Sequence, residues 1–134
     1  MSYYFTKTVK GGFEAIETEV TRLLKNEGFG ILTCIDMQQT LQKKLNVGFR
    51  NYKILGACNP PFAYKALQAE DKIGTMLPCN IIIQEHAPNT IEVSAINPMV
   101  SMKAVDNKTL ETVAQEVSLK LENIINSIEN EKKF

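Results

Sequence analysis

The chain has 134 residues, of which 44% are apolar and 22% charged, a composition that fits one globular domain, residues 1–134. Fifteen basic side chains balance fifteen acidic ones, which argues against nucleic acid as a partner because phosphate binding depends on clustered positive charge. The segment MSYYFTKTVKGG lacks the features of a signal peptide, and no apolar run reaches the ~20 residues that cross a bilayer, so we expect a cytoplasmic protein without membrane contacts.

The hydrophobic pattern of the first half predicts alternating strands and helices. Tyr3–Val9, rich in aromatic and β-branched residues, is a predicted strand. Apolar residues at helical spacing predict a helix that starts at Phe13 and is closed by Asn26 and Gly28, and Gly30–Met37 is a second predicted strand. Asp36 stands three residues before a glutamine, as in a capping box, and this predicts a short helix over Gln38–Asn46.

A third strand and helix follow without an intervening loop. Tyr52–Ala57 is the predicted strand, Asn59 is a favourable helix N-cap, and Pro60-Pro61 suits the first helical turn. The predicted helix, Phe62–Glu70, directs one apolar face towards the core. That face consists of Phe62, Ala63, Ala66 and Leu67.

The second half predicts a hairpin and a long helix. Asn80–Glu85 and Thr90–Ile96 are strands joined by a turn, and an amphipathic helix begins within Asp106–Thr109 and runs to Ile128. The order β-α-β-α-β-α-β-β-α predicts an α+β fold, a mainly antiparallel sheet of about five strands with two long helices packed on one face. The apolar stripe of the last helix is broad enough that it must cross the sheet or meet a second subunit.

Two Cys-Asn steps, Cys58-Asn59 and Cys79-Asn80, stand where polar side chains adjoin apolar strands. Such a meeting of polar groups and apolar walls is typical of a small-ligand pocket, and we expect one between the sheet and a helix. The asparagines have a second interpretation, as residues that build turns, and Asp36 has one as a helix cap. The candidate ligand-binding residues are Asp36, Tyr52, Cys58, Asn59, Cys79 and Asn80.

Cys58 also admits two interpretations. Just before a helix N-terminus, its thiolate would be stabilised by the helix dipole, and Cys79 would serve as a resolving thiol. Alternatively, Cys58 is a small core residue. The spacing of the three cysteines and His86 matches no common metal motif, and no nucleophile or phosphate-loop motif occurs. The sequence therefore predicts no metal, no cofactor and no assignable catalytic residue.

Four segments, GFGILTCIDMQQTL, FRNYKILGACNPPFAYKAL, EDKIGTMLPCNIII and INPMVSM, resemble a family of bacterial and archaeal proteins called domain of unknown function 302. The resemblance covers nearly the whole chain, with Thr33 standing where that family has Glu. It implies a TATA-binding-protein-like α+β fold with a curved sheet, and a homodimer. Because the family has no settled activity, no catalytic residue is carried over.

Three functions remain open. The leading hypothesis is an uncharacterised small-ligand-binding protein whose pocket lies near the two Cys-Asn steps. The second is a thiol-based redox or enzymatic activity that uses Cys58 with Cys79. The third is a homodimeric interaction module without chemistry of its own.

Overall fold

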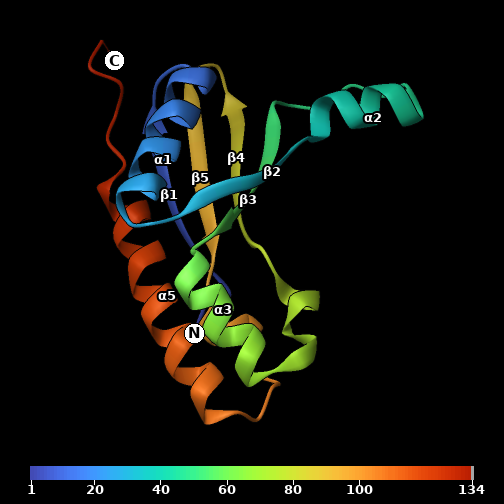
Figure 1. The fold of residues 1–134 in the computed structure, drawn as a ribbon. Helices are drawn as coiled ribbons and strands as arrows, with labels where there is room; N and C mark the ends of the chain where they lie inside the picture. Colours follow the sequence, from blue (N-terminus) through green and yellow to red (C-terminus); the bar gives the residue numbers. More distant parts are fainter. Residues whose placement is uncertain (134) are drawn as a thin grey trace.

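The computed structural model describes residues 1–133 and contains one open, five-stranded antiparallel sheet (Figure 1). The strand order is β1-β5-β4-β3-β2, and every neighbouring pair is antiparallel. This confirms the predicted fold class. The strands are β1 (Tyr4–Lys10), β2 (Gly30–Asp36), β3 (Tyr52–Cys58), β4 (Cys79–Ala87) and β5 (Thr90–Ile96).

Two long helices, α1 (Phe13–Asn26) and α5 (Lys108–Ser127), pack on the same face of the sheet, as predicted (Figure 1). Three shorter helices and a 3₁₀ helix complete the fold. They are α2 (Met37–Leu45), α3 (Pro60–Ala69), η1 (Asp71–Met76) and α4 (Pro98–Ser101). The sequence did not predict η1 or α4, because segments of four to six residues are too short to show a helical period. Among residues 1–133, no helix is both long and apolar enough to cross a membrane.

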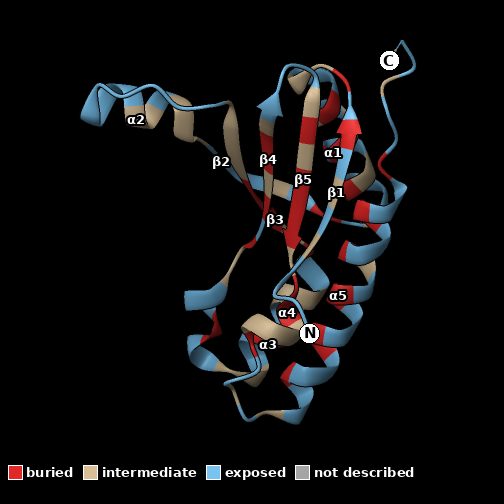
Figure 2. Ribbon diagram, turned by 180° about the vertical axis from the view of Figure 1, so that it is seen from behind, coloured by how far each residue is buried: buried red, intermediate tan, exposed pale blue. Residues whose placement is uncertain are grey.

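The hydrophobic core lies between the sheet and the two long helices (Figure 2). Alternate residues of the central strands, such as Ile81 and Val93, are fully buried on this face, opposite Leu24 and Leu121. Each such side chain stabilises the fold by about 1.5–3 kcal/mol relative to exposure. The alternation follows from the pleat of a strand, which directs successive side chains to opposite faces.

The apolar stripe of α5 is covered within one chain. Eight of its residues, from Leu110 to Ile125, are buried, and the exposed Leu119 lies outside the stripe. The helix begins after Asn107, inside the predicted window, where the Asn107 side chain accepts a hydrogen bond from the backbone N–H of Leu110 at 3.0 Å. Of the two expectations for this stripe, that it crosses the sheet or meets a second subunit, the structure shows the first, because α5 packs against the sheet.

Helix α2 extends away from the rest of the molecule (Figures 1 and 2). The capping interaction predicted for Asp36 is confirmed, because its carboxylate accepts a hydrogen bond from the backbone N–H of Gln39 at 3.0 Å. Asn46 ends the helix in the left-handed conformation, with φ of 54°. None of the nine residues of α2 is buried, so this helix contributes nothing to the core.

The other face of the sheet carries polar side chains joined by hydrogen bonds. Gln84 accepts from the Arg50 guanidinium at 2.9 Å and donates to Glu92 at 3.2 Å. The hydroxyls of Thr6 and Ser94 lie 2.8 Å apart. Gln84 and Ser94 are buried, at 8% and 7% exposure, so these hydrogen bonds satisfy polar groups that are out of contact with water.

Candidate functional site

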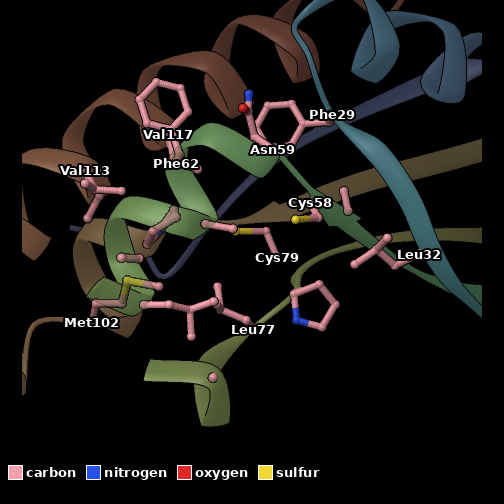
Figure 3. Close-up of a pocket in the computed structure, with 18 residues that line it drawn as sticks. Phe29, Leu32, Cys58, Asn59, Phe62, Leu77, Cys79, Met102, Val113 and Val117 are labelled. Carbon is pink, nitrogen blue, oxygen red and sulfur yellow. The ribbon is translucent and has the colours of Figure 1, made fainter. Parts of the chain in front are cut away.

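A cavity of about 340 Å³, called the pocket below, lies at the end of the sheet where β3 meets α3 (Figure 3). The ends of β3 and β4 form one wall, α3 a second, and α5 a third, with Leu77 and Met102 between them. Of the residues that the structure describes, Asn59 is the only polar one that lines it, and no charged side chain does. The cavity is therefore suited to apolar groups.

The abrupt strand-to-helix connection places α3 across the end of the sheet. Strand β3 ends at Cys58, Asn59 is the N-cap, and Pro60 begins α3. Proline is favoured at the first helical position, because its fixed φ is already helical and its missing N–H leaves no donor unpaired. The apolar residues of α3, including Phe62 and Ala66, consequently face the pocket instead of a closed core.

The side chain of Asn59 hydrogen-bonds to the turn after α1 and does not cap α3. Its side chain makes no cap hydrogen bond; its Nδ2 donates to the carbonyl of Glu27 at 3.1 Å. Pro61 removes the N–H that an N-cap side chain commonly accepts at the second helical position, so the amide is free to bind elsewhere. The predicted capping position is correct, but the predicted capping bond does not form.

The two cysteines of the Cys-Asn steps line the same cavity (Figure 3). Cys79 is paired across the sheet with Ala57, the residue before Cys58. Burial raises the pKa of the Cys79 thiol to about 11, and the neighbouring Cys58 adds a smaller contribution in the same direction. At neutral pH, Cys79 is therefore an uncharged thiol in the pocket wall.

A bulge in β2 directs Leu32 to the mouth of the pocket. The β2–β3 register shifts between Ile31 and Thr33, and Leu32 lines the cavity while staying 65% exposed (Figure 3). Bulges are common beside functional sites because they redirect one side chain out of the strand alternation.

The other three candidate residues lie away from the pocket. Asn80 is exposed and points to the opposite face of the sheet from Cys79, where it lines a shallow hollow together with Tyr52. Asp36 caps α2 and pairs across the sheet with Lys53. The structure thus brings together Cys58, Asn59 and Cys79, and separates Asn80, Tyr52 and Asp36 from them.

Most of the pocket wall was not among the predicted site residues. Phe62 and Ala66 of α3, and Val113 and Val117 of α5, stand at apolar helical positions that the sequence assigns to the core. Their spacing was the only signal, and it does not distinguish a wall of a cavity from a packed interior. Among residues 1–133, no three histidine, cysteine, aspartate or glutamate side chains lie together as a metal site.

Comparison with known proteins gives a family and a fold. A family model described as "Domain of unknown function DUF302" matches residues 5–128. A crystal structure of an uncharacterized conserved DUF302 protein from Bacillus stearothermophilus superposes with a TM-score of 0.88 at 23% identity, covering 96% of this chain and 100% of that one. No curated protein matches the chain. The family-model match spans nearly all of the sequence, and the chain therefore belongs to the DUF302 family.

Proposed function

We propose that this protein binds an uncharged, largely apolar small molecule in the pocket. The observation that carries the proposal is a cavity of about 340 Å³ with a single polar lining residue. Ligand pockets in proteins commonly start at roughly 300 Å³ and are lined mainly by apolar side chains. An apolar cavity of this size, left unfilled by neighbouring side chains, favours an occupant that gains from leaving water.

The wall chemistry selects against a charged ligand. The one polar lining residue, Asn59, commits its Nδ2 donor to Glu27, and the raised pKa of Cys79 reflects the cost of charge at this wall. Burying an ion without a partner costs several kcal/mol or more. Nucleotides and sugar phosphates are therefore poor candidates for the interior of the pocket.

A neutral fluorescent probe tests the proposal directly. N-phenyl-1-naphthylamine, whose emission rises in apolar surroundings, is expected to bind the protein saturably with one site per chain. Ala63→Phe, which fills the pocket from α3, is expected to weaken binding at least tenfold. Ala104→Phe is the matched control, because Ala104 is exposed and outside the pocket lining.

Two results would contradict the proposal. One is a wild-type protein that does not bind the probe. The other is an Ala63→Phe variant that folds, by circular dichroism, and binds the probe as tightly as Ala104→Phe. Native mass spectrometry of protein purified from its own host would further reveal a retained natural ligand as an added mass.

We also propose that the chain forms homodimers in a reducing, cytoplasmic compartment. Strand β2 is the edge of the sheet next to β3; it carries no lysine or proline, and its bulge between Ile31 and Thr33 is the one edge-protecting feature within it. The three cysteines, which include the exposed Cys34, are free, as expected where thiols stay reduced. Sedimentation velocity at micromolar concentration should show a dimer; a monomer would contradict this part of the proposal.

Thiol redox chemistry has weaker support. Cys58 and Cys79 share a cavity, which favours it, but a pKa of about 11 keeps Cys79 protonated and poorly nucleophilic at neutral pH. We therefore place ligand binding first.

A further inference from the structure

A second cavity, of about 340 Å³, lies directly beside the pocket and shares part of its wall. Pro98, Met102 and Ala114 line both spaces. Of these three residues, only Met102 has a side chain long enough to divide one space from the other. The pocket and the second cavity are therefore neighbours that a single thioether side chain separates.

The pocket and the second cavity follow one another along helix α5. Val117 lines the pocket, Ala114 lines both spaces, and Leu110, about one turn nearer the start of the helix, lines the second cavity. Val117 and Leu110 are separated by about 10 Å at the usual rise of a helix. The two spaces together are therefore elongated along α5, which suits an extended chain better than a compact ring.

Met102 can swing aside without any change of the backbone. Its N–H donates to the carbonyl of Pro98 at 3.0 Å, and α4 is held to α5 because the side chain of Asn97 accepts a hydrogen bond from the Ser118 hydroxyl at 2.8 Å. Methionine is unbranched and has three rotatable side-chain bonds, so it adapts to the shape of its surroundings. A ligand chain can thus pass between the two spaces by displacing one side chain.

The second cavity differs from the pocket in having a polar end. Lys103 and Glu111 line it, and both are exposed, so this end reaches the solvent. Among residues 1–133, neither of these side chains makes an ion pair or a hydrogen bond. A hydroxyl group can accept a hydrogen bond from the lysine and donate one to the glutamate, whereas Glu111 would repel a carboxylate.

We propose that the ligand is a single-chain, uncharged amphiphile: an alkyl chain that fills the pocket, passes Met102 and ends in a hydroxyl group between Lys103 and Glu111. This inference rests on the proposed ligand-binding function and adds the shape of the ligand, its direction and the chemistry of its end. The apolar lining of the pocket receives the chain, and each methylene group removed from water strengthens binding about fourfold.

Two alcohols of different length test the proposal by displacing N-phenyl-1-naphthylamine. Hexanol is expected to stay in the pocket, and dodecanol is expected to occupy both spaces. Val105→Phe fills the second cavity and leaves the lining of the pocket unchanged; it should weaken dodecanol binding at least tenfold and change hexanol binding less than about twofold. Ala104→Phe is the matched control, because Ala104 lines neither space.

A pair of lysine substitutions tests the contact with the hydroxyl end. Lys103→Met keeps a long side chain but removes its charge and its donors, and it should weaken dodecanol binding about threefold to tenfold without changing hexanol binding. Lys108→Met is the control, because Lys108 is also exposed and lines neither space. Both lysines are on the surface, so both variants should fold like the wild type.

The outcomes separate this inference from the function on which it rests. A wild-type protein that binds neither the probe nor the alcohols would refute ligand binding itself. If the wild type binds them, the inference is overturned by a Val105→Phe variant that folds, by circular dichroism, and binds dodecanol as tightly as Ala104→Phe. It is also overturned if Lys103→Met binds dodecanol like Lys108→Met, or if dodecanoate binds the wild type as tightly as dodecanol at neutral pH.

Discussion

The thiol of Cys79 should react with iodoacetamide far more slowly than that of Cys34. Burial raises the pKa of Cys79 from 9.0 to about 11, and only the thiolate is alkylated. Two units of pKa correspond to about a 100-fold smaller thiolate fraction at neutral pH. Cys34 is exposed on β2 of the same protein and serves as the internal reference.

Peptide-level mass spectrometry of the native protein measures both initial rates in one experiment, across a series of pH values. The rate at Cys79 should rise about tenfold per pH unit and level off only near pH 11. Steric shielding alone would lower the alkylation rate of Cys79 at every pH without shifting the pH at which that rate levels off. A Cys79 rate that levels off near pH 9 would refute the reasoning that the pocket wall excludes charge. In urea, where the wall is gone, the two cysteines should react alike.

Three further outcomes follow from the same contacts. The pKa of Cys79 is higher in the folded protein than its unfolded value of 9.0, so the contribution of the uncharged thiol to stability is complete below pH 9 and is lost as the pH rises towards 11. The free energy of unfolding should fall by about 2–3 kcal/mol over this range in urea titrations of the wild type, and this fall should be absent from Cys79→Ala. Gly56→Ala should lower the free energy of unfolding by about 1–3 kcal/mol, since the new Cβ would clash with Oγ1 of Thr33 and lie 2.6 Å from Cγ of Pro78; an unchanged urea midpoint would show that both neighbours yield freely. Asn107→Ala removes the side-chain cap of α5 and should cost about 1–2 kcal/mol in thermal unfolding, whereas Asn107→Ser should retain most of that stability.

The sequence predicted the elements well, because the local signals for them are strong. Strand Thr90–Ile96 was predicted with the bounds that the structure shows, and helix α1 was predicted with its start at Phe13 and its end near Asn26. The capping role of Asp36 depends on a spacing within four residues. These features require no knowledge of distant parts of the chain.

The candidate site was predicted only in part, and strand geometry explains the difference. The Cys-Asn steps were expected to converge as pairs, yet consecutive residues of a strand point to opposite faces. Cys79 consequently lines the pocket, and Asn80 lies on the other side of the sheet. Tyr52 and Cys58 stand at opposite ends of β3, about 20 Å apart at the usual rise per residue.

Helix α2 shows a second limit of local patterns. Its leucines and lysines segregate as they would in a helix packed on a core, but none of its residues is fully buried or belongs to the core. Amphipathic spacing states that a helix has an apolar side, and it does not state which surface covers that side.

The sequence by itself determined the order of strands and helices, the neutral charge balance and the family, because composition, periodicity and short motifs are local properties of the chain. Only the tertiary structure decided that Cys58, Asn59 and Cys79 meet at an unfilled apolar space while Asn80 and Tyr52 do not. Whether apolar residues fill a volume or surround it depends on how the end of the sheet, α3 and α5 are spaced, and that spacing arises from contacts between residues far apart in the sequence.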